Sequence, residues 1–284
     1  MPDSATLLIS SPDQRGIVAS LAEFIYKHNG NVLHADQHRD DGERLFFTRI
    51  EWSLDGFALD RADFWSAFQP LSDRFSMSPK LYYSTDRQRV GLFASRYQHC
   101  LMDLLQRHQI GELPCDISFV ISNHPEAADV ARFFGVPFHH VPVRSESKYE
   151  AEATQLQLIA DAHTDLLVLA RYMQVLSPEF VAQFAGSIIN VHHSFLPAFT
   201  GARPYHAAYE RGVKLIGATS HYVTDALDEG PIIEQDVARI SHRDQVEDLI
   251  QKGRDLEKVV LSRAVRWHLQ HRILTYANKT VVFD

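Results

Sequence analysis

The chain has 284 residues, of which 45% are hydrophobic, and a formal net charge of −8. This length predicts about two domains, the negative charge disfavours a nucleic-acid-binding surface, and no apolar run reaches the roughly 20 residues that cross a bilayer. The start of the chain lacks a secretion signal, and Cys100 and Cys115 cannot make a disulfide framework, so we expect a cytoplasmic protein without membrane or nucleic-acid partners.

Residues 1–84 predict a small α/β unit. Its apolar residues recur with strand or helix spacing in the order βαββαβ, which is typical of ferredoxin-like domains. We expect strands over 6–10, 32–38, 45–54 and 77–83, and helices beginning near Ile17 and Phe64. Asp40-Asp41-Gly42 between the middle strands is a hairpin signal.

The turn after the first strand is a candidate ligand site. Gly16 would let backbone N–H groups at the start of the helix approach an anion, next to Ile17, while Asp13 and Asn31 could hold an ammonium group. A free amino acid carries both charges. The alternative is a plain strand-to-helix connection in which Asp13 caps the helix.

Residues 85–284 predict a second unit, and the boundary between the two units lies in the polar junction 84–89. Strand and helix patterns alternate in it, which favours a doubly wound, mostly parallel α/β sheet. The expected strands are 90–94, 117–121, 138–141, 166–170, 188–191, 216–223 and 231–238, with helices through 101–105 and over 150–162, 178–184 and 245–274.

Polar residues follow the apolar segment 187–189 of this unit. Asn190 and His192 alternate along an extended segment, so their side chains share a face at the end of a buried strand. Open α/β sheets bind their ligands at this edge. Asp228 follows in the loop 224–231. The alternative is that Asn190 caps a turn and His192 is a core histidine.

These motifs carry a family resemblance. Asn190-x-His192-x-Ser194-x-Leu196-Pro197, with 217–221 and 224–233, resembles the formyltransferase domain that works on 10-formyltetrahydrofolate. The match runs in order from about residue 89 to 271. It implies a catalytic trio of Asn190, His192 and Asp228: the amide donates to the oxyanion, the imidazole adds a donor or handles a proton, and the carboxylate orients the imidazole or activates water.

The resemblance also implies the folate-binding residues Met173, Gln174, Val175, Leu176, Thr224 and Asp225, with His193 and His221 in support. A metal site is an alternative because His192, His193, His206 and His221 are close to this motif. They lack the spacing of a metal-ligand set, so we expect no metal and no cofactor beyond the folate substrate.

The first unit resembles ACT regulatory domains through Asp13-x-x-Gly16-Ile17-Val18-Ala19. This implies homo-oligomers joined through paired ACT domains, with glycine and methionine as effectors.

Two departures from the transferases concern the acceptor of the formyl group. The loop 95–99 has no glycine to cradle a phosphate, although Arg96 leaves that role open, and Tyr97 and His99 could fill the space. His193 stands where transferases often have proline. Both features, and the ACT-like unit, resemble formyltetrahydrofolate deformylases. They imply hydrolysis of 10-formyltetrahydrofolate to tetrahydrofolate and formate, supporting one-carbon balance and purine synthesis. The alternatives are transfer to an amine such as glycinamide ribonucleotide, and a non-catalytic folate or amino-acid sensor.

Overall fold

The computed structural model describes residues 3–197 and 204–283, which form two compact units. The first comprises the residues up to Arg87, His271–Tyr276 and the residues from Val281 onward. The second comprises Gln88–Gln270 and Ala277–Thr280. None of the helices within the described ranges combines the length and the apolar character that a membrane span requires.

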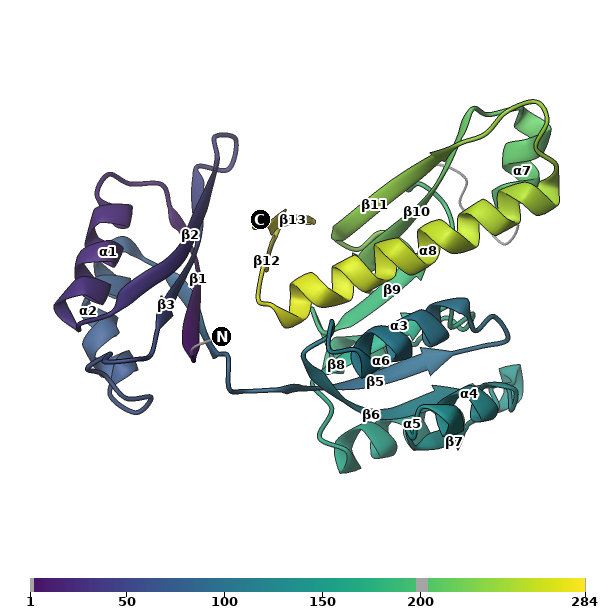
Figure 1. Ribbon diagram of the computed structural model, residues 1–284, viewed down its shortest axis with the longest axis horizontal. Helices are drawn as coiled ribbons and strands as arrows, with labels where there is room; N and C mark the ends of the chain where they lie inside the picture. The colour runs from purple at the N-terminus through teal and green to yellow at the C-terminus, as the bar shows by residue number, and fades with distance from the viewer. Residues whose placement is uncertain (1–2, 198–203, 284) are drawn as a thin grey trace. The chain divides into compact units, whose positions relative to one another are not determined.

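The first unit has the predicted order βαββαβ (Figure 1). Its strands form an antiparallel sheet in the order β2-β3-β1-β4. The elements are β1 (Ser4–Pro12), α1 (Ile17–Lys27), β2 (Asn31–Asp40), β3 (Leu45–Ser53), α2 (Phe64–Phe75) and β4 (Ser78–Tyr83). The fold class predicted for this part of the chain is therefore confirmed.

Both faces of this sheet carry buried side chains. Side chains of β1 alternate between the two faces and pack into a separate apolar cluster on each. Leu7 and Ile9 point toward α1 and α2 and pack with Ile17 and Phe68. Leu8 points to the opposite face. There it joins a buried cluster of Phe47, Leu274, Val281 and Phe283, so the end of the chain completes the core of the first unit.

This arrangement corrects two sequence predictions. The long helix ends at Leu269 instead of 274, and a hairpin of β12 (Ile273–Tyr276) and β13 (Lys279–Val282) follows it. His271 adopts a left-handed backbone with φ 51°, which ends the helical path. Assigning all of 85–284 to the second domain was also wrong, since Leu274 and Phe283 gain burial on the first unit's sheet.

His271 makes the stability of the first unit depend on pH. Its ring stacks on Tyr82 at 3.7 Å between centroids, and burial, helped by the charge of Arg49, lowers its pKa from 6.5 to about 4. Between these two pH values His271 is mostly protonated in the unfolded chain but mostly neutral in the folded chain. Stability from this group is complete above pH 6.5 and falls as the pH drops toward 4, by roughly 3 kcal/mol at most.

The urea concentration at which half of the protein is unfolded should decrease when the pH is lowered from 7 to 4.5. In His271→Phe, which keeps an aromatic ring against Tyr82 but cannot titrate, part of this dependence should disappear. Equal losses of stability in both proteins over this range would contradict the assignment.

The second unit has a seven-stranded sheet in the order β11-β10-β9-β8-β5-β6-β7. The strands from β9 to β7 are parallel, whereas β10 and β11 are antiparallel additions, so the predicted mostly parallel sheet is confirmed. Its elements are β5 (Gln88–Ala94), α3 (His99–Gln109), β6 (Cys115–Ser122), α4 (Ala127–Phe133), β7 (Phe138–His140), η1 (Ser145–Ser147), α5 (Lys148–Asp161), β8 (Leu166–Ala170), α6 (Pro178–Gln183), β9 (Ile188–His192), α7 (Pro204–Arg211), β10 (Leu215–Tyr222), β11 (Ile232–Arg239) and α8 (Val246–Leu269).

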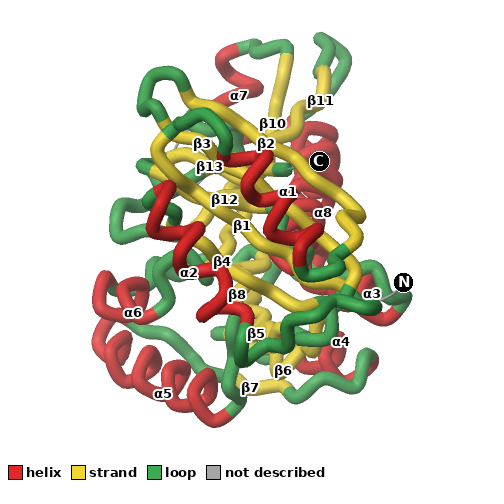
Figure 2. The backbone as a smooth tube through the Cα atoms, turned by 90° about the vertical axis from the view of Figure 1, so that its left-hand side faces the viewer, coloured by secondary structure: helices red, strands yellow, loops and turns green. Residues whose placement is uncertain are grey.

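Helices cover both faces of this sheet. In the side view, α5 and α6 lie on one face and α3, α4 and α8 on the other (Figure 2). The sheet residues Phe93, Ile121 and Leu169 pack with Ile159 of α5 and Phe180 of α6. Helices α4 and α7 were missed from the sequence, because neither has the Ser-Pro start signal that marks the equally short α6 at Ser177 and Pro178.

Candidate active site

Strand β9 brings Asn190 and His192 to the edge of the second sheet at which its parallel strands end. Antiparallel pairing with β10 sets His221 opposite Asn190 and Thr219 opposite His192. After β10 the chain enters the segment 223–231, which we call the catalytic loop and which carries Asp228. The strand register and this loop therefore bring together residues that are more than thirty positions apart in the chain.

The predicted trio is connected by one direct contact, between His192 and Asp228, and through His221, which lies close to both Asn190 and Asp228. His192 Nδ1 is 3.1 Å from Asp228 Oδ2, and His221 Nε2 is 3.6 Å from Asp228 Oδ1. Asn190 Nδ2 is 3.3 Å from His221 Nε2. His192 is 6% exposed, and its other nitrogen, Nε2, is buried without a hydrogen-bond partner among the described residues.

The charge of Asp228 determines which ring nitrogen of His192 carries the proton. The hydrogen bond to His192, followed by that to His221, outweighs partial burial and holds the pKa of Asp228 well below its usual range. The ionised carboxylate accepts the Nδ1–H of His192, which leaves Nε2 as the ring nitrogen that can act as a base toward the pocket. A buried base is therefore available beside the amide of Asn190.

His221 orients the amide of Asn190. Its Nδ1 donates to the carbonyl oxygen of Tyr222 at 2.9 Å, and its Nε2 lies 3.3 Å from Asn190 Nδ2. The second N–H of that amide stays available for a ligand.

The catalytic loop has a constrained backbone. Asp228 adopts a left-handed conformation with φ 57°. At Gly230 a Cβ atom would lie 1.8 Å from the carbonyl oxygen of Tyr222, so only glycine fits this close approach. The Gly230-Pro231 signal in the sequence therefore reflects a steric requirement next to Asp228.

A pocket of about 420 Å³ adjoins these side chains. All of the predicted catalytic, folate-binding and supporting residues line it: Asn190, His192, Asp228, Met173, Gln174, Val175, Leu176, Thr224, Asp225, His193 and His221. Apolar residues such as Leu169 and Val223 contribute further walls. The pocket thus combines an apolar slot with a few polar groups, as small-molecule sites do.

A buried ionic cluster next to this pocket was missed from the sequence. Glu257 of α8 is 1% exposed; its Oε2 lies 2.6 Å from His99 Nε2 and 3.4 Å from Arg171 Nε, and its Oε1 accepts from Tyr205 at 2.8 Å. Burial opposes the charge, but His99 and Arg171 outweigh it and lower the pKa of Glu257. Its position within the apolar stripe of α8, four residues after buried Gly253, could have signalled it.

This cluster is also the only set of three or more metal-type ligands that converge within the described residues, through His99, Cys100 and Glu257. Arg171 already supplies a positive charge to Glu257, and burial raises the pKa of the Cys100 thiol. The donor set therefore disfavours a cation.

The predicted amino-acid site does not form within one copy of the first unit. Gly16, with φ 94°, precedes α1, where Ile17 is buried and Asp13 exposed. In the sheet, however, Asn31 is level with Ser4, eight residues from Pro12. At about 3.3 Å per residue, roughly 26 Å separate the two ends. The sequence could not reveal this, because strand register is set by pairing.

Comparison with known proteins agrees with the two units. Residues 88–265 match the formyl transferase family, and residues 5–60 match the ACT domain. The fold and the site thus define a formyl-transferase-type enzyme with an ACT domain. A formyltetrahydrofolate deformylase of Synechocystis is 55% identical over 99% of this chain and 98% of its own length. The chain belongs to the formyltetrahydrofolate deformylase family.

Solved structures lead to the same family. A formyltetrahydrofolate deformylase from Pseudomonas syringae matches with a TM-score of 0.97 and 48% identity, over 100% of this chain and 95% of its own. A glycinamide ribonucleotide transformylase from Symbiobacterium toebii matches with a TM-score of 0.67 and 29% identity, over 72% of this chain and 98% of its own. The deformylase structure thus matches a larger part of this chain than the transformylase structure does.

Proposed function

We propose that the protein hydrolyses 10-formyltetrahydrofolate to tetrahydrofolate and formate. One observation carries this proposal. A buried imidazole nitrogen, Nε2 of His192, has no hydrogen-bond partner within the described chain and lines a pocket with Asn190, while ionised Asp228 holds its Nδ1–H. A base oriented by a carboxylate and next to an amide donor is what amide hydrolysis requires.

In the proposed reaction, the formyl group lies between Asn190 and His192. His192 Nε2 accepts a proton from water as the water oxygen bonds to the formyl carbon. The oxyanion accepts the free N–H of Asn190, and Asp228 stabilises the imidazolium. The bond from the formyl carbon to N10 then breaks, N10 takes the proton from His192, and the acid ionises to formate. These side chains act without a cofactor.

The proposal that water is the acceptor is supported by the loop 95–98 and the start of α3. This segment has no glycine, and Nε2 of its His99 is hydrogen-bonded to Oε2 of Glu257 at 2.6 Å. Tyr97 lies between two guanidinium groups, with Arg171 Cζ 5.5 Å and Arg254 Cζ 5.3 Å from its ring centroid. Side chains thus occupy the strand end at which a phosphorylated amine would need backbone N–H groups.

The test is formate release from 10-formyltetrahydrofolate by the purified protein in chelator-treated buffer, with and without glycinamide ribonucleotide. We expect formate at the same rate in both reactions and no formylated amine. Turnover that requires the amine would show that the protein is a transferase. The absence of turnover in both reactions would favour a non-catalytic sensor.

We further propose that the ACT domain binds an amino-acid effector, glycine or methionine, between two copies of the chain. Strand β2 is an edge strand exposed over nearly its whole length, which suits sheet extension by a second copy. Antiparallel pairing of two β2 strands would set Asn31 of one copy near the Asp40 end of the other, where Asp13 lies. Cys100 and Cys115, which are both buried as thiols, suit the proposed cytoplasmic location.

Subunit mixing tests the shared effector site. Asp13→Ala and Asn31→Ala should each abolish the effect of glycine or methionine on formate release. A mixed dimer of the two variants keeps one intact site and should regain part of the response. If mixing restores nothing, the two residues do not form a shared site.

A further inference from the structure

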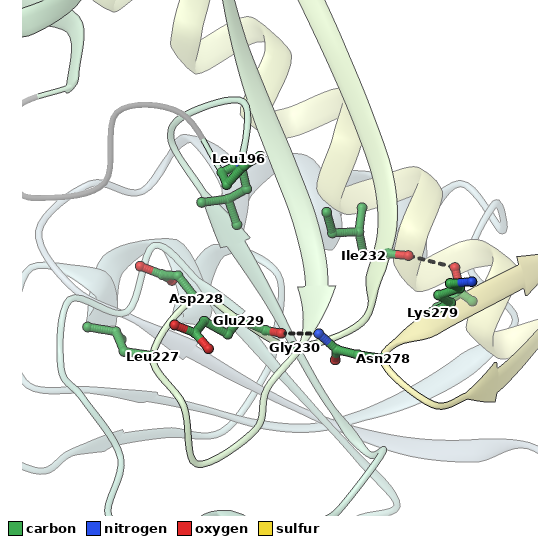
Figure 3. A pocket seen from close by; sticks show the side chains of 10 residues that line it. Leu196, Leu227, Asp228, Glu229, Gly230, Ile232, Asn278 and Lys279 are labelled. Atoms are coloured by element: carbon green, nitrogen blue, oxygen red, sulfur yellow. Dashed lines mark hydrogen bonds between the residues drawn. The ribbon is translucent and has the colours of Figure 1, made fainter.

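A second cavity, of about 560 Å³, adjoins the catalytic loop and has Leu227 and Asp228 in common with the catalytic pocket. The turn Asn278–Thr280 of the C-terminal hairpin lines it from the other side (Figure 3). Two side chains of this turn reach the backbone of the loop and of β11. Asn278 Nδ2 donates to the carbonyl oxygen of Glu229 at 2.7 Å, and Thr280 Oγ1 donates to that of Ile232 at 2.6 Å.

The contact of Asn278 lies next to Asp228, the residue of the catalytic loop that has a left-handed backbone conformation. Asp228 adopts φ 57°, a conformation that is unfavourable for a non-glycine residue and persists only when its surroundings impose it. Within the loop, the bond from Glu229 N to Ala226 O is long, at 3.3 Å. Asn278 binds the carbonyl of the residue directly after Asp228, so it restrains the Glu229–Gly230 peptide, the second peptide after the Cα atom of Asp228.

We propose that Asn278 and Thr280 are positioning residues for Asp228. They hold both sides of Gly230, and thereby keep the Asp228 carboxylate on His192 Nδ1. Neither side chain needs to touch the substrate. This inference rests on the proposed function for its kinetic readout, because a displaced carboxylate would leave His192 poorly oriented.

The test compares Thr280→Val, which removes the donor at nearly constant volume, with Thr280→Ser, which keeps it. Thr154→Val removes a comparable bond, from Thr154 Oγ1 to Glu150 O at 2.9 Å within α5, and serves as the matched control. Thr280→Val and Asn278→Ala should lower kcat roughly tenfold with little change in KM. Thr280→Ser and Thr154→Val should stay within about twofold of the wild type.

Two further measurements separate positioning from a general structural role. In an Asp228→Asn background, Asn278→Ala should cause no further loss of kcat, because the group it positions is gone. In protein labelled with ¹⁵N-histidine, the His192 Nδ1–H signal, identified by its loss in His192→Gln, should weaken in Thr280→Val and persist in Thr280→Ser and Thr154→Val.

An unchanged His192 signal in Thr280→Val, or equal kcat losses in the serine and valine variants, would overturn the inference. Because the spectrum needs no turnover, it judges the positioning role even if the wild type releases no formate. The absence of formate from the wild type would by itself overturn the proposed function.

Discussion

Asp228→Asn is expected to lower kcat by about 10³- to 10⁴-fold while the protein remains folded. An asparagine amide can present its N–H₂ to His192 Nδ1, which then accepts a hydrogen bond and moves the ring proton to Nε2. The base that faces the pocket is thereby lost. Asp228 Oδ2 lies 3.1 Å from His192 Nδ1, so this change acts through direct contact.

The measurement is single-turnover formate release together with thermal unfolding. Asp129→Asn, on an exposed face of α4 where Asp129 pairs with Arg132, is the control for removing one carboxylate and should keep full activity. If Asp228→Asn kept more than about a tenth of the wild-type rate, the carboxylate would not govern the state of His192.

Asn190→Ala is expected to lower kcat by about 10²- to 10³-fold with KM little changed, because the lost N–H would serve the oxyanion more than the bound substrate. His221 Nε2 orients this amide at 3.3 Å, so the donor is preorganised. Asn190→Asp should be slower still, since a carboxylate would repel the developing negative charge.

Rates and KM should be measured for both Asn190 variants without effector. Asn31→Ala, an exposed asparagine of the first unit, is the matched control and should behave as the wild type under those conditions. An Asn190→Ala variant that raised KM but kept kcat would show that the amide binds substrate without stabilising the transition state.

Much of the candidate site could be predicted from local patterns. The alternation of Asn190 and His192 after a buried strand indicated that both side chains face one side of the sheet edge. The Gly230-Pro231 signal marked a loop whose glycine the structure requires, because a Cβ atom there would lie 1.8 Å from Tyr222 O. Strand and helix periods gave both fold classes, since each depends on neighbours only a few residues away.

Interactions across long separations in the chain could not be predicted. Glu257 lies 86 residues after Arg171 (257 − 171) and 158 after His99, so no local pattern connects the members of that cluster. Likewise, the burial of Leu274 and Phe283 against Leu8 depends on the docking of the chain's end, and strand register alone separates Asn31 from Asp13.

The sequence by itself determined the order of most elements, the two kinds of fold and the residues that we propose to act on a formyl group. These properties follow from side-chain chemistry and short-range periodicity. Only the tertiary structure decided that Asp228 holds His192, that Asn278 and Thr280 support the catalytic loop, and that the chain's end completes the first core. Such features depend on which distant surfaces pack together, which is a property of the folded chain as a whole.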